Sequence, residues 1–297
     1  MGVWGTKLYS GDFAMDLRST IGAVARLPFD GDRLAEIVAE REPASAGRPD
    51  DSDHTTFWLV LADQFAKRAI ACDRVRDKAL EIIDSGADLA ALKKLGMDAA
   101  GLKQRASMLA ELRRRLEAPL PADKPRPVLK KPQPFLMELG DVFVYPTCHG
   151  KNINPYFKSK DREKMWINGA SVPWTQDGWS AFVILDRGRA FEFLPWYRLL
   201  TLGTALTEKP TLDQLRIRRT WRLNSAGTCT PFRMKRLELE KIGSFRLDPV
   251  LLRQLRPEMK PGTSAAISDI CICNGLNAGS IHRSGGMTIL EFTENFR

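Results

Sequence analysis

Cysteine and histidine are the residue types in this chain that could form a metal centre, or a nucleophile with its base. Cys148 and His149 are adjacent, and Cys271 and Cys273 are one residue apart. Neither spacing matches a usual zinc motif, in which about two to four residues separate paired ligands. Adjacent side chains of a strand point to opposite faces, so Cys148 and His149 could act together only from a turn. We therefore expect buried or incidental thiols, with no metal site and no catalytic residue.

The other candidates for chemistry are weaker. His282 lies in a Ser- and Gly-rich segment without a neighbouring base or nucleophile, so a structural or solvent-facing role is expected. Asp12 and Asp16 are one helical turn apart and could hold a cation, but helix capping and the helix dipole account for both. The glycines form neither a phosphate-binding loop nor a dinucleotide-binding motif. The one enzymatic alternative is a hydrolase that uses Cys148, His149 or His282.

Basic residues dominate one segment of the second half of the chain. Gln214–Leu223, if it is a strand, places alternate arginines on one face. The candidate binding residues are Arg216, Arg218, Arg222, Arg233, Lys235 and Arg236. With a formal net charge of +9, they predict a positive surface that attracts phosphate or a carboxylate-rich protein. A solvated face of a sheet is the alternative interpretation.

Tryptophans of the same half could form a second binding surface. Trp174 and Trp179 stand near flexible Asn-Gly and Asp-Gly steps, together with Trp166, Trp196 and Tyr197. Tryptophan often anchors protein interfaces, but it also fills small cores, so both interpretations stay open.

The first half of the chain has the sequence pattern of helices. Apolar residues recur at three- and four-residue steps, which predicts an α-helical bundle over residues 1–118. Asp12, Asp32 and Asp98 are placed to cap or begin helices, while Glu42 to Asp53 indicates a loop.

A change of composition separates the two halves. Residues 119–134 contain six prolines and four lysines or arginines, which predicts an extended, partly stiff linker. Residues 135–297 alternate short aromatic or branched runs, the last of them Met287 to Phe292, with turn residues. This pattern predicts a mainly antiparallel β-sheet or small barrel, with one or two helices near Pro249 to Leu255. Asp186 to Arg189 indicates a hairpin turn between two of its strands. The expected fold class is α+β.

Length and composition indicate the number of domains and the cellular compartment. The chain has 297 residues, of which 43% are hydrophobic, so two domains of ordinary size are expected. No apolar run approaches the roughly 18 residues of a membrane span, and a secretory start is lacking. Five cysteines without an export signal predict reduced thiols and a cytoplasmic protein without a membrane partner. Gly2 and Thr6 also satisfy the N-myristoylation pattern, although a turn packed by Trp4 explains the same residues.

Two stretches resemble known families. Met1-Gly2-x-Trp4-Gly5-Thr6 with Asp12-x-Ala14-x-Asp16 resembles a bacterial family of unknown function that begins Met-Gly-x-Trp-Gly-Thr, and the likeness covers roughly residues 1–120. Leu139-Gly140-Asp141-Val142-Phe143-x-Tyr145 resembles the first strand of an immunity-protein family of bacterial toxin systems. The sequence departs from that family from Lys151 to Arg162, where a glycine-rich hairpin is expected.

The resemblances imply a bacterial cytoplasmic protein with an immunity-like or other binding role and no assigned catalysis. Many immunity proteins that block nucleases are acidic, because they mimic nucleic acid. This chain is basic, so we expect its partner to be an acidic toxin and not a nuclease. We therefore expect a non-enzymatic protein that sequesters a partner protein by steric occlusion, without a cofactor. A nucleic-acid-binding component of a bacterial defence system is the alternative, and the hydrolase comes third.

Overall fold

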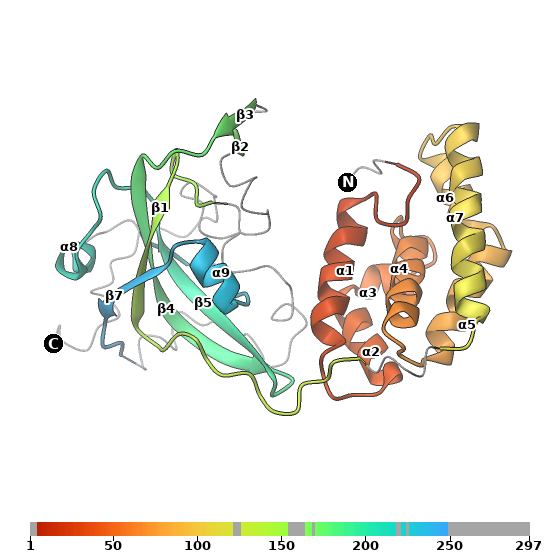
Figure 1. Ribbon diagram of the computed structural model, residues 1–297, viewed down its shortest axis with the longest axis horizontal. Helices are drawn as coiled ribbons and strands as arrows, with labels where there is room; N and C mark the ends of the chain where they lie inside the picture. Colours follow the sequence, from red (N-terminus) through yellow and green to blue (C-terminus); the bar gives the residue numbers. More distant parts are fainter. Residues whose placement is uncertain are drawn as a thin grey trace. The chain divides into compact units, whose positions relative to one another are not determined.

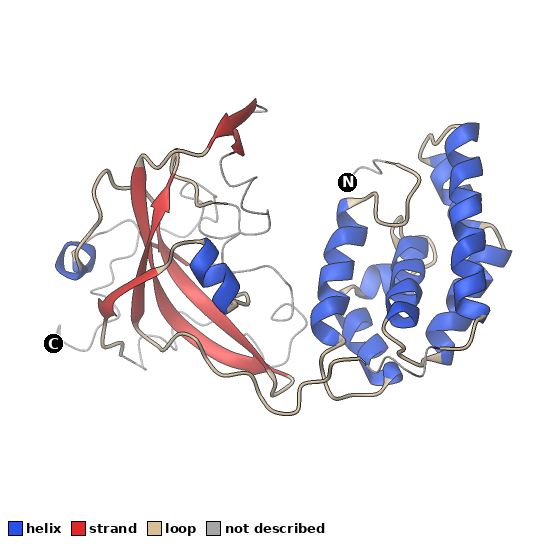
Figure 2. Cartoon of the chain, in the orientation of Figure 1, coloured by secondary structure: helices blue, strands red, loops and turns tan. Residues whose placement is uncertain are grey.

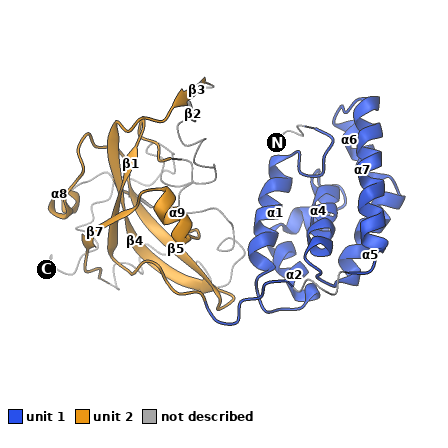
Figure 3. Cartoon of the chain, viewed as in Figure 1, with its two compact units in different colours: residues 1–132, 267–269 blue, residues 133–266, 270–297 orange. Residues whose placement is uncertain are grey.

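The chain folds as an α+β protein, as the sequence predicts. The computed structural model describes residues 5–120, 126–153, 164–167, 170–217, 221–223 and 226–248. Helices α1 to α7 come first, and a mainly antiparallel sheet follows (Figures 1 and 2). Over the described residues the chain divides into two compact units, the first ending at Pro132 and the second beginning at Gln133 (Figure 3).

Part of the sequence-based predictions falls outside the described residues. These are the predicted helix near Pro249 to Leu255, the predicted strand over Met287 to Phe292, the opening Met1 to Trp4, and the candidates Arg218, Cys271, Cys273 and His282. Among the helices that are described, none is long and apolar enough to cross a bilayer.

The helical unit is built around one central helix. Its elements are α1 (Asp12–Val24), α2 (Gly31–Arg41), α3 (Pro43–Gly47), α4 (His54–Lys67), α5 (Asp73–Asp84), α6 (Ala87–Lys94) and α7 (Ala99–Glu117). Helix α4 contacts α1, α3, α5, α6 and α7. Its residues Phe57, Leu59, Val60 and Leu61 are fully buried. A helix that is apolar on most sides must lie inside its unit, which is where α4 is found.

Two of the helix starts test the predicted capping. The Asp98 carboxylate accepts the N–H of Gly101 at 2.7 Å, so Asp98 caps α7 as predicted. Helix α2 begins one step earlier than predicted, because the Asp30 carboxylate accepts the N–H of Arg33 at 2.8 Å and Asp32 lies inside the first turn. The predicted loop from Glu42 to Asp53 is wrong in part, since it contains the short helix α3.

The β-rich unit holds a curved sheet with two short helices. Its five strands are β1 (Asp141–Thr147), β4 (Gly178–Ala190), β5 (Leu194–Leu202), β6 (Trp221–Leu223) and β7 (Glu240–Ser244), in the order β6-β5-β4-β1-β7, and each neighbouring pair is antiparallel. Strands β2 (Lys164–Ile167) and β3 (Ala170–Pro173) pair separately. The helices are α8 (Leu212–Arg216) and α9 (Pro231–Arg236).

Both faces of the larger sheet are covered. Val142 and Val144 of β1 pack into one core cluster, whereas Phe143 and Tyr145 pack into another. Alternate residues of a strand point to opposite faces, so each cluster covers one face of the sheet. This double coverage explains why the central strands read as nearly continuous apolar runs.

The predicted hairpin turn at Asp186 to Arg189 is wrong, because these residues continue β4. Gly188 lies under the indole of Trp196, where a Cβ atom would stand 2.6 Å from Cζ2. The glycine therefore provides space for a ring. The chain reverses instead just after Ala190, where Phe191 and Glu192 have φ values of 49° and 64°.

The predicted strand from Gln214 to Leu223 is also wrong over its first part. Thr211 accepts the N–H of Gln214 at 3.3 Å, and the Gln214 side chain accepts the N–H of Thr211 at 2.8 Å. This reciprocal capping box begins α8 and takes Arg216 into a helix. Of the described residues in this stretch, Trp221–Leu223 alone pair as a strand. A continuous ridge of arginines along one strand is therefore not formed.

Candidate metal centre

A tight turn after β1 places Cys148 and His149. Cys148 and Lys151 exchange both backbone hydrogen bonds, at 2.9 and 3.0 Å. The two residues between them, His149 and Gly150, have φ values of 50° and 72°. Two positive φ values are typical of a two-residue hairpin turn, and histidine enters this region more readily than most residues. The turn that the sequence argument required for Cys148 and His149 to act together is present.

Asp177 reaches the same turn from the neighbouring strand. It directly precedes β4, and the register pairs Thr147 with Gly178. The N–H of Asp177 donates to the Thr147 carbonyl at 3.0 Å. Gly178 is needed there, because a Cβ atom would stand 2.7 Å from the carbonyl oxygen of Leu206. The backbone around Asp177 is thus fixed on both sides.

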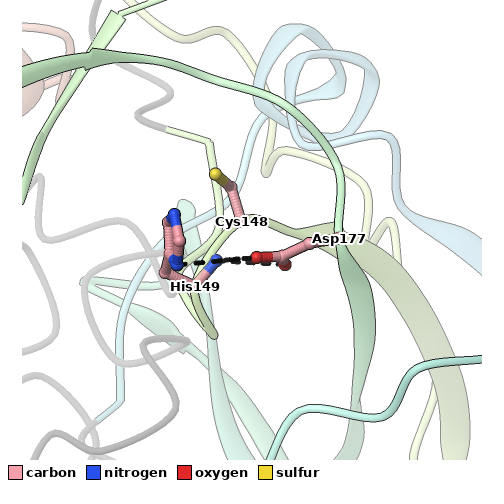
Figure 4. A group of neighbouring side chains, drawn as sticks. All are labelled: Cys148, His149 and Asp177. Carbon is pink, nitrogen blue, oxygen red and sulfur yellow. Dashed lines mark hydrogen bonds and ion pairs between the residues drawn. The ribbon is translucent and has the colours of Figure 1, made fainter.

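The His149 backbone orients the Asp177 carboxylate. The N–H of His149 donates to both carboxylate oxygens, at 2.8 and 3.0 Å. The imidazole Nδ1 lies 3.7 Å from Oδ2 of the same carboxylate, which is too long for a hydrogen bond. Figure 4 shows the imidazole and the carboxylate facing each other, with the Cys148 side chain beside them.

Three different donor atoms therefore converge at the end of β1. One donor atom from each of Cys148, His149 and Asp177 lies within 4.8 Å of the other two. Cys148 is buried, while the side chains of His149 and Asp177 are 65% and 46% exposed. Sequence reasoning considered the first two residues and missed Asp177, because its position depends on how β1 pairs with β4.

The other thiols in the described residues are isolated. Cys72 and Cys229 are buried and form no disulfide within the part of the chain that is described. Burial raises the pKa of Cys229 to about 12 and also raises the pKa of Cys72. Both thiols therefore stay protonated at neutral pH and are poor ligands or nucleophiles.

The structure brings three of the predicted basic residues together. Arg233, Lys235 and Arg236 lie on α9, where Lys235 is exposed and the two arginines are partly buried. Phe232 on the same helix is 67% exposed. Helix α9 thus presents an aromatic ring beside basic side chains.

The remaining predicted arginines do not join that group in one strand. Arg216 ends α8, and its guanidinium carbon lies 5.9 Å from the centre of the Phe245 ring. Arg222 pairs through its backbone with Thr201, and its side chain lies outside the description. Arg218 is outside the described residues altogether.

Trp174 and Trp179 do not share a surface. Trp174 packs, partly buried, against the core cluster that contains Phe143, and Trp179 packs against the cluster that contains Val142. Lys209 lies 5.4 Å from the centre of the Trp179 ring. Both indoles serve mainly as core residues, on different faces of the sheet.

Comparisons with protein-family models, with curated proteins and with solved structures gave no match to this chain. The two family resemblances of the sequence therefore stay predictions.

Proposed function

We propose that the β-rich unit binds one divalent transition-metal ion through Cys148, His149 and Asp177. The observation that carries the proposal is the convergence of a sulfur, a nitrogen and an oxygen donor within 4.8 Å of one another.

The separation of the imidazole from the carboxylate is closer to the spacing of metal ligands than to a hydrogen bond. Nitrogen and oxygen ligands on a tetrahedral zinc ion lie roughly 3.3–3.5 Å apart, given metal–ligand bonds of about 2.0–2.2 Å. The 3.7 Å between His149 Nδ1 and Asp177 Oδ2 is close to that spacing. Both side chains are exposed to solvent, so they can rotate to close the small difference between 3.7 Å and the spacing of ligands on zinc. The backbone N–H bonds to Asp177 supply the kind of outer contact that orients a ligating carboxylate.

The donor set favours zinc over calcium or magnesium. Thiolate and imidazole are ligands of zinc and its neighbours, whereas the hard cations prefer oxygen alone. Three protein ligands leave one coordination position open, as in catalytic zinc sites. A water bound there would have a lowered pKa, so hydrolysis is the reaction class that such a centre supports.

The same three residues could instead form a thiol nucleophile with its base. Burial argues against this use, because reactive cysteines are partly exposed, and Cys148 is only 2% exposed. A buried sulfur is compatible with a metal ligand, since the ion itself lies between the sulfur and solvent.

The test is metal titration of the reduced, metal-free full chain. Cobalt(II) should give thiolate-to-metal charge-transfer absorption at one ion per chain, and calorimetry with zinc should give the same stoichiometry. Cys148→Ser should abolish the absorption. His149→Ala and Asp177→Asn should each weaken affinity by at least about tenfold, because losing a direct ligand costs no less than losing a partner that orients one. Cys72→Ser and Asp213→Asn are the matched controls, because they make the same changes away from the turn.

Two results would contradict the proposal. Cobalt binding that is equal in wild type and in all three ligand variants would place any ion elsewhere. Rapid alkylation of Cys148 by iodoacetamide in the metal-free chain, with no response to zinc, would favour the thiol nucleophile and hence the hydrolase alternative.

A second candidate function is the binding of an acidic protein partner. This is the function that the sequence analysis predicts, for a cytoplasmic, immunity-like protein. It is favoured by the exposed Phe232 beside Lys235 on α9. Aromatic and basic residues together are typical of interface anchors. An acidic protein recovered with the wild type from the native host, and lost with Phe232→Ala/Lys235→Glu, would support it. Nucleic acid recovered instead, with binding that falls steeply with salt, would favour the nucleic-acid alternative.

A further inference from the structure

Three arginines surround a hollow on one flank of α1, in the helical unit. The hollow measures about 520 Å³. The residues around it that matter here are Met15, Arg18, Ser19, Gly22, Arg26 and Arg68. The positions from α1 recur at three- and four-residue steps and so follow one side of the helix and its C-terminal extension. Arg68 follows α4 directly, as its C-cap residue.

Ion pairs among the described residues do not neutralise the positive charges around this hollow. No Asp or Glu contributes to its lining. Within the described part of the chain, Arg18, Arg26 and Arg68 form no ion pair. Arg18 lies over the Tyr9 ring at 5.2 Å, and Arg68 donates to the Gln64 carbonyl at 3.3 Å. These contacts position the guanidinium groups of Arg18 and Arg68, and neither contact is an ion pair.

Burial and charge act together on Arg68. Burial lowers the pKa of its guanidinium, and the positive charge of Arg18 lowers that pKa further, while Tyr9 and the Asp63 carboxylate oppose the shift. Such a shift means that the protonated form is held in an unfavourable environment. A bound anion would remove this penalty, since it would offset both the desolvation and the repulsion.

Gly22 keeps the floor of the hollow open. A Cβ atom at this position would meet only a guanidinium nitrogen of Arg68, at an ordinary contact distance of 3.7 Å. Packing therefore does not require glycine here, although glycine is the poorer helix former. The absence of a side chain leaves room for a ligand between the arginines.

We propose that this hollow binds the phosphate group of a small phosphorylated ligand. The fork of guanidinium N–H donors matches phosphate oxygens, and the volume lies within the range of small-molecule sites. Met15, which is 60% exposed at the rim, offers an apolar contact to the rest of such a ligand. The three charges border one hollow, whereas a nucleic-acid surface spreads its basic residues along a groove.

The test is calorimetric titration of the full chain with inorganic phosphate and with pyrophosphate, at constant chloride. Arg18→Ala and Arg26→Ala should each weaken binding about tenfold, the loss expected for one charge-assisted contact. Arg33→Ala is the matched control, because it removes the same charge from a neighbouring helix where Arg33 is paired with Glu36 and Glu40. It should leave phosphate affinity unchanged.

Loss of fold must be separated from loss of the site. Arg26→Glu changes an exposed position, so it should keep the helical circular dichroism of the wild type while abolishing phosphate binding. Phosphate affinity that is equal in wild type, Arg18→Ala and Arg26→Ala would overturn the proposal. Binding of a DNA or RNA oligomer without binding of either phosphate probe would overturn it too, in favour of a nucleic-acid surface.

Discussion

Asp88 in the helical unit and Asp177 in the β-rich unit show two different uses of a carboxylate. The side chain of Asp88 is 1% exposed and receives two N–H bonds from Arg105, at 2.8 and 3.0 Å. The side chain of Asp177 is 46% exposed, and no lysine or arginine of the described residues pairs with it. Its neighbours are instead the His149 backbone, an imidazole and a thiol. The first carboxylate is satisfied by the fold, and the second retains capacity for a ligand.

The same contrast holds for a second buried carboxylate of the helical unit. Asp63 accepts hydrogen bonds from Tyr9, Lys67 and Arg115, and it is only 2% exposed. Burial and the Asp63 carboxylate together raise the pKa of Tyr9, so its hydroxyl stays a donor. A carboxylate with several donors around it stabilises its unit, because leaving it unpaired would be costly. Helical-unit carboxylates should therefore govern stability, and Asp177 should govern ligand binding.

The largest expected effect comes from Arg105→Met. It leaves the buried carboxylate of Asp88 without its partner, which typically costs about 3–5 kcal/mol. Urea unfolding followed by helical circular dichroism measures the loss. Asp88→Leu/Arg105→Met removes both charges and should recover most of the stability. If the unfolding free energy of Arg105→Met alone lies within about 1 kcal/mol of wild type, the ion pair does not stabilise the fold.

Zinc should stabilise the β-rich unit and leave the helical unit unchanged. A ligand at a hundred times its dissociation constant adds about 2.7 kcal/mol to the unit that binds it. Tryptophan fluorescence reports mainly on the β-rich unit, because five of the seven tryptophans follow residue 133. His149→Ala should lose the zinc effect while its metal-free stability stays within about 1 kcal/mol of wild type. If zinc stabilises His149→Ala as much as wild type, the ion does not bind at this turn, and the assignment of Asp177 to ligand binding is wrong.

Gly188→Ala should destabilise the β-rich unit without affecting the metal centre. Its Cβ atom would stand 2.6 Å from the Trp196 ring, and such overpacking costs about 1–3 kcal/mol. The control is Gly47→Ala in α3, where a Cβ atom meets nothing within 4 Å. Denaturant unfolding measures the change in stability of both variants. Cobalt affinity should not change in Gly188→Ala, because Asp177 lies at the other end of β4; a tenfold fall would mean that the whole strand positions the site.

The helices and the fold class were predictable because their causes are local. Asp98 caps α7 through a residue three positions away, and the apolar face of α4 repeats along one segment. The start of α8 was also readable, since Thr211 and Gln214 have capping-box spacing. The alternating arginines that follow favoured a strand, and the cap overrides that pattern.

The candidate metal centre could be predicted only in part. His149-Gly150 is a plausible turn, since both residues accept positive φ. Asp177 cannot be assigned to that turn from spacing, because it follows Cys148 by 29 positions and meets it through strand register. The chain reversal at Phe191 could not be predicted from the sequence either, since neither Phe191 nor Glu192 commonly adopts a positive φ.

The smallest expected effect concerns Asp16, a solvent-facing carboxylate of the helical unit that lacks the hydrogen bonds of Asp88. Partial burial raises the pKa of Asp16, and Asp12 contributes in the same direction, while Arg41 opposes it. A raised pKa means that the native state favours the protonated form. The contribution of Asp16 is therefore fully present at pH values below its unfolded pKa and is lost as the pH rises through its folded pKa.

Asp16→Asn should remove this dependence, so the variant should be slightly more stable than wild type at neutral pH and equal to it in acid. The gain should stay within about 0.5 kcal/mol, because the group is solvent-screened. Urea unfolding at a series of pH values measures it. A variant that loses stability at neutral pH would mean that the charged carboxylate has a favourable partner, and would place Asp16 with Asp88 among the stabilising carboxylates.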